Sequence, residues 1–153
     1  MNTVIIEMIM AFSACFFFAI VYNTPKRELI FCGLFGGLAY GIYYCLTHFY
    51  GFGTSANFFG ALLIAFLARI TSLSRHIPVM VYVLPAVFPL SPGGNMYNAA
   101  YAIIISDMYT AVDQTMVCIK IVGVCVIAIL IVLSLPEMLF RPFEKKCPAD
   151  VSK

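Results

Sequence analysis

Charged side chains are scarce in this chain of 153 residues. Only 10% of the residues are Asp, Glu, Lys or Arg, whereas 63% are apolar, and the formal net charge is +2. A soluble domain carries about 25% charged residues, so too little polar surface remains here to face water. The same shortage excludes a basic nucleic-acid-binding protein and a disordered chain. The sequence therefore predicts an all-α integral membrane protein embedded in a lipid bilayer.

The residue patterns of enzymes and metalloproteins are missing as well. The sequence has only two histidines, and its six cysteines are spread through apolar runs without metal-ligand spacing. It contains no Gly-rich nucleotide loop and no nucleophile accompanied by a base in a recognisable arrangement. We therefore expect no enzymatic activity, no catalytic residue, no metal and no cofactor.

Long apolar runs are what the sequence does contain. About 20 apolar residues cross a bilayer as a helix. Four runs of this length predict regular crossings, at residues 3–23, 29–50, 54–74 and 114–136. A fifth uncharged window, 77–106, contains four prolines and a pair of glycines, so it cannot form one regular helix. We treat residues 1–140 as one transmembrane domain and residues 141–153 as a polar cytoplasmic tail.

The window 77–106 is either one broken crossing or a re-entrant dip. Cytoplasmic loops collect Lys and Arg. If the window crosses, the loops 24–28 and 75–76 and the C-terminal tail share one side, and the opposite side has no basic side chain. A dip would move the basic residues of the tail to the other side. The charge pattern therefore favours five crossings, with the N-terminus outside and the C-terminus in the cytoplasm.

Residues 1–22 resemble a signal peptide in their length, and the run from Phe12 to Cys15 resembles a lipoprotein cleavage box. No basic residue precedes this apolar stretch, however, and seven further apolar residues follow Cys15. We therefore expect the stretch to be retained as the first span.

The interruption of the fifth window is the main candidate for a binding site. Ser91 followed by Pro92 has the pattern of a helix start, with Ser91 as the N-cap and Pro92 at the first helical position. A half-helix that starts there directs the backbone N–H groups of Gly93, Gly94 and Asn95 into the membrane. Its N-terminal end carries about half a positive charge. A carboxylate would satisfy such donors.

The same pattern also fits a plain Pro-Gly kink whose donors are satisfied by neighbouring side chains. Several polar groups follow on the predicted half-helix, among them Asn98 and Ser106, and they favour a polar cavity over a kink. The predicted substrate-binding set consists of Ser91, Pro92, Gly93, Gly94, Asn95, Tyr97 and Asn98.

Two charges interrupt the first and last spans. Glu7 lies in the run 3–23 and Lys120 in the run 114–136, at a similar depth in the predicted topology. Charged groups within spans usually find partners inside the bundle, which predicts an ion pair or a shared place along the pathway. Alternatively, each side chain extends to the nearby outer interface. We consider Glu7 or Asp107 for the handling of a coupling proton.

A row of glycines marks the second span. Gly33, Gly37 and Gly41 recur at every fourth position, with Gly36 beside them. Small residues at this spacing form a smooth ridge that the backbone of another helix approaches closely. The ridge therefore predicts tight helix packing rather than a chemical role.

Three stretches together resemble a known family. They are the Asn-x-Pro-basic turn in residues 18–27, the Ser-Arg-His-x-Pro run within residues 69–78, and the Pro-x-x-Pro-Gly pattern with a following Tyr in residues 85–97. In their order and spacing they resemble the threonine/serine exporter family. Within it, the chain is similar to the small, YjjB-like membrane subunit of a two-component exporter. The second glycine, Gly94, departs from the family's pattern.

The resemblance implies a subunit that works with a second membrane chain, which carries further helices and a soluble portion. It also implies residence in the inner membrane of a bacterium. Members of the family are described as exporters of threonine and serine, or of succinate in the two-component case. All three metabolites carry a carboxylate, which agrees with the anion-binding half-helix expected from the residues alone.

We therefore expect secondary export of a small carboxylate metabolite, driven by an ion gradient because no nucleotide motif is present. One alternative is an assembly subunit whose partner holds the whole substrate pathway. Another is a small proton-coupled multidrug exporter that uses a Glu in its first span, although five crossings and the basic asymmetry count against it. The expected partners are the lipid bilayer, the second subunit and the substrate, with a homo-oligomer of this chain as a further option.

Overall fold

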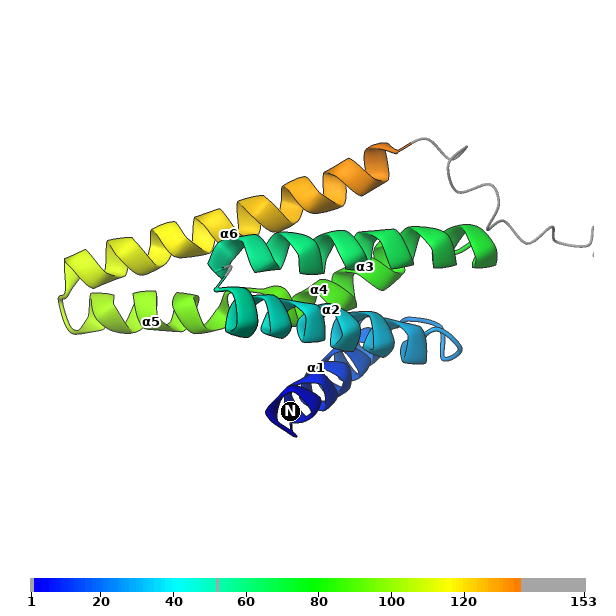
Figure 1. Cartoon of the computed structure of the whole chain (residues 1–153), viewed down its shortest axis with the longest axis horizontal. Helices are drawn as coiled ribbons and strands as arrows, with labels where there is room; N and C mark the ends of the chain where they lie inside the picture. Colours follow the sequence, from blue (N-terminus) through cyan, green and yellow to red (C-terminus); the bar gives the residue numbers. More distant parts are fainter. Residues whose placement is uncertain (1, 52, 136–153) are drawn as a thin grey trace, which may run out of the picture.

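The computed structural model of the chain describes residues 2–51 and 53–135. Within these ranges the chain forms helices joined by short turns and contains no strand, which confirms the predicted all-α class (Figure 1). The helices are α1 (Asn2–Val21), α2 (Leu29–Tyr50), α3 (Gly53–Arg75), α4 (Met80–Val87), the 3-10 turn η1 (Phe88–Leu90), α5 (Gly93–Ile104) and α6 (Met108–Ser134). The predicted tail, 141–153, lies outside the described residues.

Four helices of the described chain are long and apolar enough to cross a membrane, namely α1, α2, α3 and α6. They coincide with the four regular crossings expected from the apolar runs. Helix α6 begins at Met108, several residues before the predicted run 114–136, because Asp107 caps a first turn that is polar but still helical. The window 77–106 contains only shorter helices, which are separated by a break between Leu90 and Gly93.

Helix α4 lies at the centre of the bundle and packs against α1, α2 and α3. Its sequence, Met-Val-Tyr-Val-Leu-Pro-Ala-Val, is apolar on all sides, and such a helix is stable only when it is surrounded. Tyr82 of α4 and Ile64 of α3 are among the largest fully buried side chains. After α4, Phe88 of η1 packs against Phe18 of α1, and the centroids of the two rings are 3.6 Å apart. The first half of the interrupted window is therefore held firmly by three helices.

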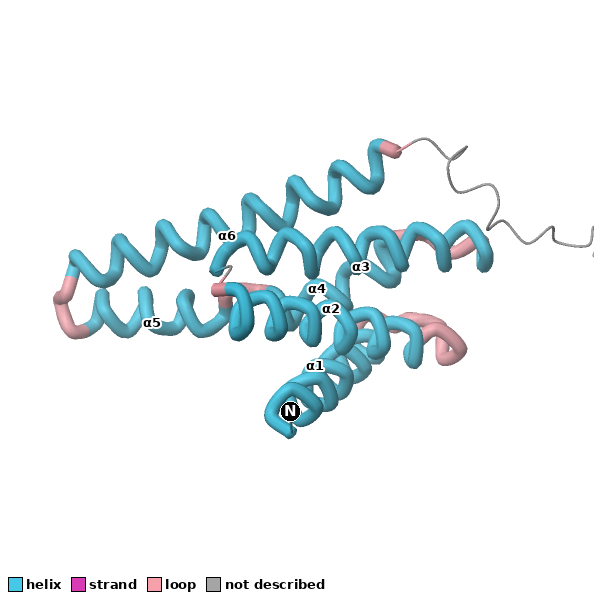
Figure 2. The backbone as a smooth tube through the Cα atoms, viewed as in Figure 1, coloured by secondary structure: helices cyan, strands magenta, loops and turns pink. Residues whose placement is uncertain are grey.

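Helices α5 and α6 form a hairpin that contacts the rest of the bundle only through α6 and α3 among the described elements. Among the described elements α5 packs only against α6, and α6 packs against α5 and α3. Figures 1 and 2 show α5 continuing beyond η1 in the direction of α4 and passing the end of the α1–α4 bundle, after which α6 returns. Ala99, Ala102 and Ala111 are the buried residues of this contact, whereas Tyr97 and Ile104 on α5 are 70% and 79% exposed.

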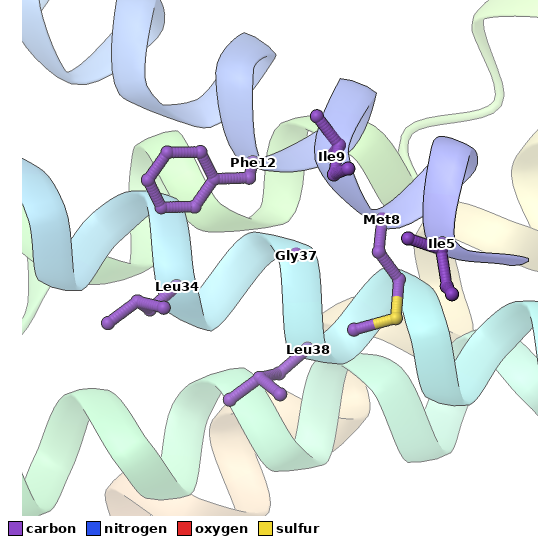
Figure 3. A pocket seen from close by; sticks show the side chains of 7 residues that line it. All are labelled: Ile5, Met8, Ile9, Phe12, Leu34, Gly37 and Leu38. Atoms are coloured by element: carbon purple, nitrogen blue, oxygen red, sulfur yellow. The ribbon is translucent and has the colours of Figure 1, made fainter.

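The glycines of α2 lie against α1. A Cβ atom added to Gly33 would meet the Phe12 ring at 2.8 Å, and one added to Gly41 would meet Met8 Sδ at 2.8 Å. At Gly37 the Met8 carbonyl oxygen would lie 3.3 Å away, so the two backbones approach closely there, as Figure 3 shows. The ridge thus occupies the α1–α2 interface, where an added side chain would displace residues of α1.

Candidate functional site

The backbone is interrupted at the position where the prolines predicted a break, but the local geometry differs from the expected one. Ser91 has an extended backbone (φ −62°, ψ 138°) and Pro92 is the N-cap of α5, without a capping side chain. The expectation of Ser91 as N-cap is therefore wrong by one residue. The reason is that the main chain of Ser91 ends η1, because its N–H donates to the carbonyl of Phe88 at 3.1 Å.

This geometry also changes which amide groups are available. The N–H of Gly93 donates to the carbonyl of Ser91 at 2.8 Å, and the N–H of Met96 donates to the carbonyl of Pro92 at 3.0 Å. In the part of the chain that the structure describes, no backbone bond is found for the N–H groups of Gly94 and Asn95, as is usual in the first turn of a helix. Two of the three expected donors therefore have no backbone partner among the described residues.

The surroundings of the break are open. A Cβ atom added to Gly93 or Gly94 would have no neighbour within 4 Å, and both glycines are exposed. Asn95 is half-buried, and Asn98 is exposed. Tyr97 stacks on Tyr101 one turn further along α5, with ring centroids 6.4 Å apart. The predicted substrate-binding residues thus share one helix end, but this chain alone does not enclose them.

The structure does not bring Glu7 and Lys120 together. Glu7 is half-buried on α1 and interacts with Tyr40 of α2. Lys120 is exposed on α6, and α1 and α6 are not in contact within the described chain. The ion pair expected between the first and last spans is therefore absent from the single chain, because α4 and α3 occupy the space between these helices.

Asp107 has a structural role at the start of α6. Its Oδ1 accepts from the N–H of Thr110 at 3.2 Å, and its Oδ2 accepts from the Thr110 hydroxyl at 2.6 Å. These bonds, the hydroxyl first, lower the pKa of the Asp107 carboxyl below its ordinary value. Both carboxylate oxygens of Asp107 are thus engaged in the first turn of α6, and the coupling role considered for Glu7 or Asp107 stays a prediction.

A second polar cluster joins three helices at the opposite end of α4. Glu28 Oε1 accepts from Arg75 Nη1 at 2.7 Å, and Glu28 Oε2 accepts from the Tyr82 hydroxyl at 2.9 Å. Glu28 is only 3% exposed, and Tyr82 is fully buried. The guanidinium carbon of Arg75 also lies 4.6 Å from the centroid of the Phe31 ring, which favours the cation.

The electrostatics of the two helix ends favour this pair. Glu28 is the N-cap residue of α2, although its side chain makes no capping bond, and Arg75 is the last residue of α3. An anion is stabilised at a helix N-terminus and a cation at a helix C-terminus. Removing one partner of a buried ion pair costs about 3–5 kcal/mol because the other charge is left unpaired. The exposure of the Arg75 side chain, 39%, reduces that cost through solvent screening.

A polar cleft of about 670 Å³ opens beside this pair. Its lining comes from the start of α2, the end of α3 and the turns next to them. It consists of Arg27, Glu28, Phe31, Ile70, Thr71, Ser74, Arg75 and Ile77. By contrast, the groove between α1 and α2 in Figure 3 is lined by apolar residues alone, so it has no group to orient a charged ligand.

Sequence reasoning missed the cluster because Glu28 and Arg75 fall in loops that were weighed only for their charge. The separations of 47 and 54 positions from Glu28 to its two partners leave no local pattern. The one available signal was the position of Glu28, an acidic residue directly before the apolar run 29–50, where a helix N-terminus stabilises an anion.

Comparison with known proteins identifies the family. No solved structure matches the chain. A family model described as "Threonine/Serine exporter, ThrE" matches residues 7–135, a range that contains both the break after Leu90 and the Glu28 cluster. The match covers most of the chain, and it agrees with the resemblance of the three sequence stretches. The chain is therefore a member of the threonine/serine exporter family.

Proposed function

We propose that this chain is a membrane subunit of a secondary exporter that moves small carboxylate metabolites, either threonine and serine or a dicarboxylate such as succinate. It works with a second membrane subunit in the inner membrane of a bacterium. The family match and the four long apolar helices support a multi-pass membrane exporter. The substrate class, the partner and the location are our proposals.

One observation carries the proposal for the substrate. The window 77–106 is interrupted, and the N–H groups of Gly94 and Asn95 have no backbone partner in the described chain. A helix N-terminus with open donors and exposed glycines attracts an anion. Unpaired donors at bilayer depth persist only where water, protein or a ligand reaches them. A substrate carboxylate meets this requirement, and threonine, serine and succinate all carry one.

We also propose that the interrupted window makes a fifth crossing. Residues 80–90 and 93–104 supply about 35 Å of helix at 1.5 Å per residue, compared with a hydrocarbon core of about 30 Å. The ion pair of Glu28 and Arg75 holds the α1–α2 and α3–α4 loops at one end, and α5 continues away from that end in Figure 1. Because basic loops collect on the cytoplasmic side, we propose that this end faces the cytoplasm.

The open face of α5 supports the proposed second subunit. Helix α5 packs against α6 alone among the described elements, and its apolar side chains Met96, Tyr97 and Ile104 are largely exposed. A second membrane chain laid against this face would enclose the end of α5 and exclude water from Gly94 and Asn95. The substrate site would then lie between two chains.

The exposure of the break also favours a second candidate, an assembly subunit whose partner binds the substrate alone. A photoreactive succinate analogue separates the two ideas in membranes that contain the complete exporter. Under our proposal it labels α5 of this chain as well as the partner. Labelling confined to the partner would favour the assembly role.

Efflux of matched charged and neutral compounds tests the substrate class. Cells with and without the intact chain are loaded with labelled L-threonine, L-serine, succinate or L-threoninamide, which lacks the carboxylate. We expect the chain to accelerate the loss of at least one carboxylate and to leave the loss of threoninamide unchanged. Equal acceleration of threonine and threoninamide would contradict recognition of a carboxylate.

A further inference from the structure

We propose that the cleft beside Arg75 is a second carboxylate-binding site, in which a substrate carboxylate replaces Glu28 on the Arg75 guanidinium. The inference rests on the proposed export of carboxylates and adds a binding step at the end of the bundle away from α5. At that end, the substrate carboxylate first contacts Arg75, and it competes there with the carboxylate of Glu28.

The guanidinium of Arg75 already holds a carboxylate in a suitable geometry. Nη1 of Arg75 donates to Oε1 of Glu28 at 2.7 Å, the length of a charge-assisted hydrogen bond. The two partners differ in access, since the side chain of Arg75 is 39% exposed and that of Glu28 is 4% exposed. A ligand in the cleft can therefore reach the cation directly, while the internal carboxylate lies behind it.

The cleft has the size and the charge for a small anion. Its volume of about 670 Å³ falls in the range of small-molecule sites, about 300–1,000 Å³. Two cations, Arg27 and Arg75, and one anion, Glu28, line it, which leaves an excess of one positive charge. Thr71 and Ser74 make the α3 wall of the cleft polar, although the Thr71 hydroxyl already donates to the carbonyl of Leu67 at 2.9 Å. Phe31 supports the guanidinium plane of Arg75.

Replacement of Glu28 by a ligand on Arg75 would change the contacts of α4, the first helix of the interrupted window. Glu28 is bonded at the same time to Arg75 and to Tyr82 near the start of α4. When a ligand takes over Arg75, Glu28 keeps only its bond to Tyr82, so this polar link between α4 and the end of α3 is lost, while the packing of α4 against α3 remains. Helix α4 leads through η1 to the break at Ser91 and Pro92. Occupation of the cleft is thereby linked to the other end of α4.

The phosphate of an anionic lipid would also be attracted by two arginines near a membrane surface. We assign the cleft to a soluble carboxylate because its cation already binds a carboxylate, that of Glu28. The experiment therefore includes a lipid arm.

Equilibrium binding of labelled succinate and L-threonine to the full chain, reconstituted with its companion subunit in zwitterionic vesicles, tests the inference. Glu28→Gln removes the competing charge but keeps the size of the side chain and an acceptor for Tyr82. It should tighten binding of at least one probe about tenfold. Arg75→Gln in the Glu28→Gln background should abolish this gain without leaving a lone buried charge. Asp113→Asn, which neutralises an exposed carboxylate on α6 away from the cleft, is the matched control and should change nothing.

Two results would overturn the inference. One is unchanged affinity for both probes in Glu28→Gln. The other is a cleft that responds to lipid, so that adding anionic phospholipid to the vesicles removes the binding that Arg75 provides. The failure of the proposed function is distinguishable, because Gly94→Val acts at the break and should leave the Arg75-dependent binding intact. A chain that binds the probes at Arg75 but does not export them would contradict the proposed function alone. A chain that exports them without binding at Arg75 would contradict the cleft site alone.

Discussion

Glu28 and Arg75 are 47 positions apart in the chain, yet Oε1 of Glu28 lies 2.7 Å from Nη1 of Arg75. This contact joins the start of α2 to the end of α3, and Tyr82 adds the start of α4. The loops 24–28 and 75–76, which the distribution of basic residues assigns to one side, thus meet at one end of the bundle. A buried carboxylate therefore organises the end of the bundle from which α4 departs.

Tyr82→Phe should destabilise the bundle because it leaves Glu28 Oε2 without its donor in a buried place. A hydrogen bond to a charged group is worth about 1.5–3 kcal/mol, so we expect the free energy of unfolding to fall by about that amount. Denaturant unfolding in mild detergent measures it. Tyr101→Phe on the exposed face of α5 is the control and should shift stability by less than about 0.5 kcal/mol. Equal effects of the two changes would show that the Glu28 contact has no energetic weight.

Gly36→Ala should also destabilise the chain, because the new methyl group would overlap the sulfur of Cys15 in α1. Overpacking of this kind costs about 1–3 kcal/mol. In contrast, Gly123 on α6 has no neighbour within 4 Å of an added Cβ. There, Gly123→Ala should raise stability by up to about 1 kcal/mol through helix propensity.

Removing the sulfur should rescue the first variant. In the double variant Gly36→Ala with Cys15→Ala, the free energy of unfolding should lie closer to that of the original chain than in Gly36→Ala alone. A double variant that is weaker by the sum of both single changes would contradict close packing of α1 on α2 at this point.

Thiol labelling measures the number of crossings. In a background without native cysteines, Lys26→Cys and Ser55→Cys mark the two ends of the bundle, and Ile105→Cys reports on the end of α5. A membrane-impermeant maleimide is added to intact cells and to inside-out vesicles. Five crossings predict that Ile105→Cys labels from the same side as Ser55→Cys. Labelling from the side of Lys26→Cys would instead identify 77–106 as a re-entrant dip.

The four long helices were predictable because the thickness of a bilayer sets the length of an apolar run. The exact residues at which the helices begin and end were less predictable. Asp107 and Thr110 extend α6 into a polar first turn, which an apolar window does not register. Similarly, the prolines predicted the break, but the choice of Pro92 rather than Ser91 as N-cap depends on how η1 ends, and that depends on its packing.

The polar contacts were the least predictable. Glu28 and Tyr82 are 54 positions apart, and no spacing rule links them before α4 has been placed between α1, α2 and α3. The pairing expected for Glu7 rested on equal depth alone, and depth does not say which helices are neighbours. The glycines of α2 were informative because close approach of helices constrains residue size directly: a Cβ added to Gly37 would lie 3.3 Å from the Met8 carbonyl oxygen.

Efflux of threonine, serine and succinate from cells that carry Gly94→Val, compared with Gly123→Val, tests the central claim most directly. Neither added side chain meets a neighbour at its Cβ, so both variants should reach the membrane in normal amounts. The account predicts that Gly94→Val abolishes export, because the valine covers the open N–H groups at the start of α5, while Gly123→Val exports normally. Normal export by Gly94→Val at normal membrane abundance would contradict it.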